Sequence, residues 1–241
     1  AAKQYKVATQ MGNQGQAADG PRRLREMIWD GVIGPIREVH VWTDRPNNGL
    51  LKIYWPQGVR RPSDTPPVPP ELDWDLFLGP APERPFNPAY HPFVWRGWWD
   101  YGTGAMGDMG AHIFDAPIWA LNLGMPTKIQ ATSSPYSTDY MPLCEMVTYD
   151  FPARGYMPPV RVTWCDGGLR PPRPEQLEAG RAMKDATYYG DKGIITHASH
   201  GAIPELIPAN NDFKGPDPWI PRTGNIFEDF VDAIKNGKKS C

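Results

Sequence analysis

Proline is concentrated in one part of this sequence, and that concentration limits what the chain can fold into. Twelve of its 29 prolines lie between Pro46 and Pro92. Proline has no amide hydrogen and a fixed φ, so a segment this rich in proline cannot form a long helix or a central strand. The sequence therefore predicts a long loop over residues 44–103, with the regular elements on either side of it.

The same segment carries many large aromatic side chains, which a disordered linker would lack. Burying one such ring removes on the order of 150–250 Å² from water. We therefore predict an ordered loop that packs onto the surface of the domain. Its aromatic residues are Tyr54, Trp55, Trp74, Phe77, Phe86, Tyr90, Phe93, Trp95, Trp98, Trp99 and Tyr101.

Outside this loop, several short segments alternate apolar and polar residues, the pattern of a strand with one buried face. Glycines at 190 and 193 enclose a hairpin turn between the last two of these segments. Alternation of this kind is typical of an antiparallel sheet with one solvated face. The predicted strands are residues 36–43, 127–132, 144–151, 160–164, 186–189 and 194–197.

Apolar residues at helical spacing predict helices over residues 17–29 and 104–121, and a last helix that Thr223 caps and Gly237 ends. Residues 6–11 form a short strand-like run that leads into a turn. The predicted fold class is α+β: an open antiparallel β-sheet covered by helices, with a long loop rich in Pro and Trp.

Charge and cysteine content exclude several classes of partner. The net charge is -2 and no block of like charges occurs, so a nucleic-acid partner is not expected. No apolar run approaches the roughly 20 residues needed to cross a bilayer, so no membrane partner is expected either. Cys144, Cys165 and Cys241 form no C-x-x-C pair, which predicts neither a disulfide framework nor a thiolate zinc site.

Residues 101–115 contain the clearest chemical pattern. Glycines precede a helix on which Asp108 and His112 are four residues apart and therefore share a face. Asp108 could orient the imidazole of His112 as a general base, with Asp115 close to the same side. The same spacing also fits a surface or capping pair. Metal binding by these three residues is a further alternative, although no H-E-x-x-H spacing supports it.

Four segments of the sequence resemble parts of a known protein family. Residues 102–121 resemble the glycine-rich D-x-G-x-H-x-x-D helix of Gfo/Idh/MocA oxidoreductases. Residues 23–46 resemble the helix and strand that lead into the substrate domain of that family. Residues 72–108 resemble the Trp-rich loop of its bacterial subgroup with a specialised C-terminal domain, and residues 152–168 extend the match.

The resemblance implies an NAD(P)-dependent oxidoreductase that acts on a hydroxyl of a sugar, amino sugar or cyclitol. His112 would be the acid/base, and Asp108 would orient it or bond a neighbouring hydroxyl. The expected cofactor is NAD or NADP, with contacts from Asn13, Gln14, Trp42 and Arg45. The expected substrate-binding residues are Arg96, Trp98, Trp99, Asp100, Tyr90, His91 and Asp115. His40, His197 and His200 are interpreted as structural.

The resemblance also divides the chain. Residues 1–30 would be the end of a Rossmann nucleotide-binding domain, and residues 31–241 a substrate domain, truncated at its end. The G-x-G-x-x-G strand-turn-helix unit expected near the start is missing, so we expect a fragment that is inactive alone. Two alternatives remain open: a redox-neutral NAD-dependent glycosidase, and a non-catalytic carbohydrate-binding or assembly module. The open sheet favours a homo-oligomer, and both cytoplasm and periplasm fit as the compartment.

Overall fold

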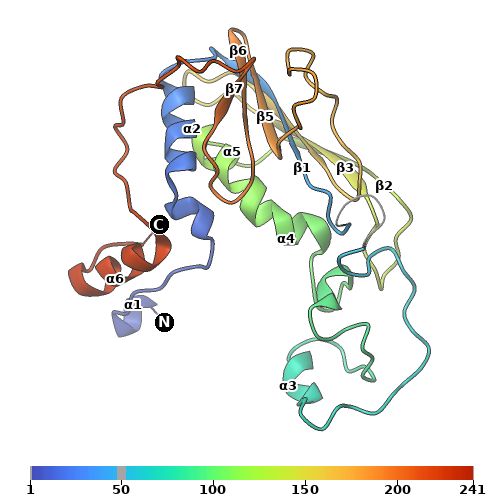
Figure 1. The fold of residues 1–241 in the computed structure, drawn as a ribbon. Helices are drawn as coiled ribbons and strands as arrows, with labels where there is room; N and C mark the ends of the chain where they lie inside the picture. The colour runs from blue at the N-terminus through green and yellow to red at the C-terminus, as the bar shows by residue number, and fades with distance from the viewer. Residues whose placement is uncertain (1, 48–52, 241) are drawn as a thin grey trace.

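The computed structural model describes residues 2–47 and 53–240, and among these residues seven strands form one open sheet. Helices α2, α4 and α5 lie along one face of it (Figure 1). The order across the sheet is β2-β3-β4-β1-β5-β6-β7. The strands are β1 (Ile36–Trp42), β2 (Lys128–Ser133), β3 (Glu145–Phe151), β4 (Val160–Cys165), β5 (Ala186–Gly190), β6 (Gly193–His197) and β7 (Glu205–Ile207).

The α+β class with an open sheet is confirmed, and all six predicted strands of the sheet are present. The sheet is mixed rather than wholly antiparallel, because β1 pairs with β4 in parallel and with β5 antiparallel. A parallel pair needs a long crossover connection. Here the proline-rich loop, two helices and two strands lie between β1 and β4, so the chain can return in the same direction.

The first and second predicted helices form, with one break. Helix α2 is Asp19–Trp29, preceded by the short 3-10 helix η1 (Gln14–Ala17). The predicted helix over 104–121 is instead two helices, α4 (Gly104–Ile113) and α5 (Asp115–Ala120). Pro117 explains the break, because it has no amide hydrogen to give to the carbonyl of Ile113 and its ring crowds that carbonyl.

Two predictions near the ends of the chain are wrong. Residues 6–11 form no strand: the chain there follows helix α1 (Ala2–Tyr5) and pairs with none of the described strands. Alternation alone does not make a strand, since the backbone needs a hydrogen-bonding neighbour. The last helix, α6 (Ile226–Asn236), forms and ends at Gly237 as predicted, but Asn225 caps it, not Thr223. Figure 1 shows α1 and α6 together, away from the sheet.

The proline-rich loop is ordered and nearly free of regular structure, as predicted. Of the described part of residues 44–103, only α3 (Trp74–Leu78) and η2 (Val94–Gly97) are helical. Trp55 and Trp98 are each only 1% exposed, so the aromatic rings form the loop's own core. Residues 48–52 of this loop, and Cys241, lie outside the described residues.

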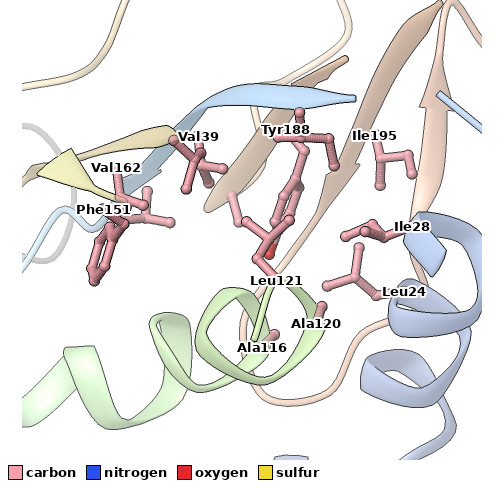
Figure 2. Packing of buried hydrophobic residues seen from close by; sticks show 14 of the residues in the cluster. Leu24, Ile28, Val39, Ala116, Ala120, Leu121, Phe151, Val162, Tyr188 and Ile195 are labelled. Atoms are coloured by element: carbon pink, nitrogen blue, oxygen red, sulfur yellow. The ribbon is translucent and has the colours of Figure 1, made fainter. Parts of the chain in front are cut away.

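The main hydrophobic core lies between the sheet and the helices (Figure 2). Leu24 and Ile28 from α2 meet Leu121, at the end of α5, below the central strands. The sheet contributes Val39, Val162, Tyr188 and Ile195, all at 0% exposure. Two further bonds fix the helices to each other, from Arg25 Nη1 to the Trp119 carbonyl and from Trp29 Nε1 to the Ala120 carbonyl.

The opposite face of the sheet is not uniformly solvated, which corrects the expectation of one exposed face. Trp42 on this face is 8% exposed, because its Nε1 donates to the Lys184 carbonyl and Arg170 stacks over its ring at 4.5 Å. Strand β2, by contrast, is exposed along its whole length. The segment between β4 and β5 therefore covers only the centre of this face. No helix within the described residues is long and apolar enough to cross a membrane.

A buried carboxylate ties the chain before α6 to α2. Glu26 is 1% exposed, and its Oε1 accepts hydrogen bonds from the amides of Trp219 and Ile220, both at 2.9 Å. Both terminal nitrogens of Arg222 also donate to this carboxylate. Burial alone would raise the pKa of Glu26, but the hydrogen bonds from Arg222 and the two amides outweigh it and leave the pKa below its ordinary value.

We expect Glu26→Gln to lower the free energy of unfolding at pH 7 by about 2 kcal/mol, because charged hydrogen bonds are lost in a buried position. The folded pKa lies below the unfolded one. This stability is therefore present above the ordinary Glu pKa of about 4.3 and is lost as the pH falls through the lowered folded value. Urea unfolding at several pH values measures it, with the exposed Glu83→Gln as control. A pH-independent difference between variant and wild type would contradict the assignment.

Candidate functional site

His112 lies in the last turn of α4, at the edge of a narrow hollow. The hollow has a volume of about 10 Å³, which is room for one water molecule. It can therefore take a hydroxyl group but not a whole sugar ring. Four segments form it: the η1 region, the start of α2, the junction of α4 and α5, and the chain after β6. Its lining includes Asn13, Gly15, Pro21, His112, Asp115, His197 and Gly201.

The environment of His112 favours its neutral form. Burial lowers the pKa of His112, and the positive charge of His200 lowers it further, while the Asp108 carboxylate opposes both. The Nδ1 atom of His112 is buried and has no hydrogen-bond partner among the described residues. A neutral imidazole has one nitrogen free to accept a proton, so His112 can act as a general base near neutral pH.

His200 stacks on His112 and was not identified as a site residue from the sequence. The ring centroids are 4.3 Å apart and the planes meet at 27°. His200 follows β6 in a left-handed conformation, with φ of 60°, and its Nδ1 is 2.8 Å from Ser199 Oγ. The pattern Ser-His-Gly gives no sequence signal that this turn reaches α4. His197, in contrast, has structural partners: Tyr188 donates to its Nε2, and its Nδ1 donates to the Ala198 carbonyl.

Asp108 does not hydrogen-bond to the buried Nδ1 of His112. Its Oδ1 accepts a hydrogen bond from Arg96 Nε at 2.9 Å, which joins α4 to the proline-rich loop. Arg96 is held in turn by the Phe93 carbonyl and by the Phe93 ring, 4.1 Å below the guanidinium. Asp108 therefore acts on His112 through its charge. The predicted orienting hydrogen bond is replaced by this ion pair.

Asp115 and Asn13 lie on the other side of the hollow. Asn13 directly precedes Gln14, the first residue of η1. Its Nδ2 donates a hydrogen bond to the Ala111 carbonyl at 3.1 Å. Burial raises the pKa of Asp115, and a hydrogen bond from Asn13 opposes this. The structure thus gathers three of the predicted residues, His112, Asp115 and Asn13, around one hollow.

The aromatic residues predicted to bind substrate lie beyond the other end of α4. Helix α4 has ten residues and so spans about 15 Å. Tyr90 and Trp98 are buried in the loop, with their rings edge-to-face at 5.1 Å. His91 packs edge-on against Phe77, and Trp99 is 50% exposed. None of these four residues lines the hollow beside His112.

Asp100 in the same loop has structural partners. Arg61 and Arg84 both donate to its Oδ2. Burial raises the pKa of Asp100, but these two arginines outweigh it and leave the pKa lowered. Arg61 also binds Asp139, so the cluster holds the loop to the segment before β3. The predicted role in substrate binding has no supporting contact in the hollow.

Of the predicted cofactor residues, Gln14, Trp42 and Arg45 do not line the hollow. Trp42 is packed on the far face of the sheet, as described above. Arg45 pairs with Asp44 and stacks over Tyr54 at 4.4 Å. The hollow itself is lined by no lysine or arginine. Its volume of about 10 Å³ leaves no room for a dinucleotide, although Asn13 and His112 could meet a small polar group.

Metal ligation was the other alternative for Asp108, His112 and Asp115. Asp108 is turned to Arg96 and Asp115 is bonded by Asn13. Within the described parts of the chain, no group of three or more His, Cys, Asp or Glu residues is placed to hold a metal ion.

Comparison with known proteins found a family model that matches this chain and solved structures with a similar fold. The model of the oxidoreductase family, C-terminal alpha/beta domain (GFO_IDH_MocA_C2), matches residues 21–155, more than half of the chain. No curated protein matches this chain. An NAD-binding protein from Listeria innocua has a similar solved structure, with a TM-score of 0.53 at 12% identity over 99% of this chain.

Two further solved structures are similar at lower scores. The aldose-aldose oxidoreductase from Caulobacter crescentus, complexed with glycerol, has a TM-score of 0.47 at 13% identity over 99% of this chain and 57% of its own. An oxidoreductase from Sinorhizobium meliloti has a TM-score of 0.46 at 14% identity over 93% of this chain and 53% of its own. The chain spans 57% of the length of the Listeria innocua protein.

We expect His200→Asn to raise the pKa of His112, because the variant removes the neighbouring imidazole charge that lowers it. Asparagine tolerates the left-handed backbone at this position. Titration of the His112 ring protons by NMR measures the pKa. His91→Asn, at the other end of α4, is the matched control and should leave it unchanged. An unchanged His112 pKa in His200→Asn would show that the stacked pair is not electrostatically coupled.

Proposed function

Because the chain belongs to the oxidoreductase family of the Gfo/Idh/MocA type, we propose that it supplies the substrate side of an NAD(P)-dependent enzyme. The reaction would oxidise a hydroxyl-bearing carbon of a sugar, amino sugar or cyclitol to a carbonyl, or reverse that step. The activity would belong to a protein in which this chain is joined to a dinucleotide-binding domain.

One observation carries the proposal: a half-buried His112 that its surroundings keep neutral, at a hollow sized for a single hydroxyl. Oxidation of an alcohol removes a hydride from the carbon and a proton from its oxygen. When bound, the nicotinamide accepts the hydride. His112 takes the proton, and general-base catalysis of this kind contributes about 10²–10⁴ in rate.

The neighbours of His112 support a polyhydroxylated, uncharged substrate. Asn13, Asp115 and His200 place an amide, a carboxyl and a second imidazole around the hollow or against His112. These groups can donate to or accept from hydroxyls on adjacent carbons. Because the hollow is lined by no lysine or arginine, it offers a phosphorylated sugar no counter-charge.

The test uses the longest native protein that contains this sequence. It is incubated with NAD or NADP and a panel of free sugars, cyclitols and aryl glycosides, while NADH absorbance and aglycone release are followed together. We expect the reduced cofactor to form with a free sugar or cyclitol. Aglycone release without net NADH would replace this proposal with the redox-neutral glycosidase, and silence in both assays would contradict both.

In that protein, His112→Ala should lower kcat by about 10²–10⁴, because the proton acceptor is lost. The KM for the cofactor should change little, since His112 does not hold the dinucleotide. Tyr136→Ala, on an exposed loop, serves as the control and should retain full turnover. Normal kcat in His112→Ala would remove His112 from the mechanism.

The 241-residue chain by itself should form no NADH with any of these substrates. The physical reason is that the glycine-rich strand-turn-helix unit that binds the pyrophosphate is missing near the start of this sequence, so the cofactor is not held beside His112. The same absorbance assay at high enzyme concentration checks this. NADH production by the isolated chain, above that of its His112→Ala variant, would show that the described residues suffice for cofactor binding.

A further inference from the structure

A second cavity lies at the opposite end of α2 from the His112 hollow. The hollow touches Pro21 and Leu24 near the start of this helix, whereas the second cavity is lined by Ile28 and Trp29 at its end. Helix α2 has eleven residues and is therefore about 16 Å long. The two sites are separate, and the second cavity has no role in the function proposed above.

The walls of this cavity are apolar and aromatic. Ile36 and Met157 form its base and are only 4% and 7% exposed. Trp29 forms one wall, with Tyr156 edge-on to it at 5.9 Å, and Tyr156 is 71% exposed at the opening. These side chains leave a space of about 230 Å³ that is open to one side.

The volume sets the size of a ligand. An apolar cavity of about 150 Å³ in another protein is large enough for benzene. A space of about 230 Å³ therefore takes one ring or short chain with a small polar group. It is below the roughly 300–1,000 Å³ of pockets that hold drug-sized molecules or cofactors, so a dinucleotide is excluded.

Arg154 brings a buried positive charge to the cavity without a counter-charge. Its Nε donates to the Leu121 carbonyl and its Nη1 to the carbonyls of Pro152 and Pro158. Its Nη2 is buried without a hydrogen-bond partner, and no carboxylate within the described residues pairs with it. Burial lowers the pKa of Arg154, which shows that the charged form is poorly compensated.

Lys192 adds a second positive charge at the rim. It lies in the hairpin turn between β5 and β6 and lines the same cavity. Its neighbour Asp191 is engaged by Arg37, and the Lys192 ammonium has no ion-pair partner among the described residues. The cavity thus combines an apolar interior with two cations that lack an anion.

We propose that this cavity binds a small amphipathic monocarboxylate. The ring or short chain lies between Trp29 and the apolar base, and the carboxylate accepts a hydrogen bond from the Lys192 ammonium. The charge of Arg154, whose Nε and Nη1 are bonded to carbonyls and whose Nη2 is buried, attracts the carboxylate at short range. A neutral sugar does not suit this arrangement, because the walls offer it few polar partners.

Calorimetric titration of the chain with 3-phenylpropionate tests the proposal. We expect saturable binding with one site per chain. The neutral isostere 3-phenylpropionamide should bind at least tenfold more weakly, because charge-assisted hydrogen bonds are each worth about 1.5–3 kcal/mol and 1.4 kcal/mol is a factor of ten. Inorganic phosphate alone should not saturate the site, because it buries no apolar surface.

Two variants locate the bound probe without disturbing Arg154, whose bonds to three carbonyls organise the loop. Lys192→Gln should weaken 3-phenylpropionate binding about two- to fivefold, because Lys192 is exposed and an exposed charged contact is worth up to about 1 kcal/mol. Tyr156→Ala should weaken it by removing one aromatic wall. Lys214→Gln, at an exposed lysine that does not line the cavity, is the matched control and should bind normally.

Three results would overturn the proposal. They are equal affinity for the acid and the amide, an affinity that neither Lys192→Gln nor Tyr156→Ala changes, and the absence of any saturable binding by a folded chain. Each is independent of the oxidoreductase assay, since none of them involves His112 or a dinucleotide.

Discussion

The packing of α2 and α5 beneath the central strands determines where everything else in this molecule lies. Leu24 and Ile28 on α2 and Leu121 after α5 fill the space below Val39 and Tyr188 (Figure 2). Burying such side chains contributes about 1.5–3 kcal/mol each, which is more than the roughly 0.5–1.5 kcal/mol of a hydrogen bond between neutral groups. Because α2 is fixed along its whole length, its two ends form two separate sites.

The break between α4 and α5 shapes the first of these sites. Pro117 ends α4 at Ile113, so His112 stands in the last turn of one helix and Asp115 starts the next. In an unbroken helix the two residues would simply lie one turn apart. The new helix direction lets α5 pack against α2, while His112 meets the chain after β6. A single proline thus places His112 at the meeting point of three elements.

The electrostatic surroundings of His112 and Arg154, near the two ends of α2, differ. Burial and the charge of His200 lower the pKa of His112 more than the Asp108 carboxylate raises it, which favours the neutral imidazole. Around Arg154 the charge is bonded only to carbonyl oxygens, at the end of α5 and in the loop before β4. A neutral base suits proton transfer, whereas an uncompensated guanidinium suits an anion. The different chemistry proposed for the two sites follows from this contrast.

The sequence by itself determined six of the seven strands in the described sheet, because period-two alternation reflects burial on one side, but it did not reveal the three-residue β7. It also determined the proline-rich loop, because proline cannot join regular structure. It also singled out His112. Only the tertiary structure decided the partner of Asp108, the stacking of His200, and the parallel pairing of β1 with β4. Spacing along one element reveals which residues share its face. Contacts between elements far apart in the chain depend on the direction of packing, which no local pattern specifies.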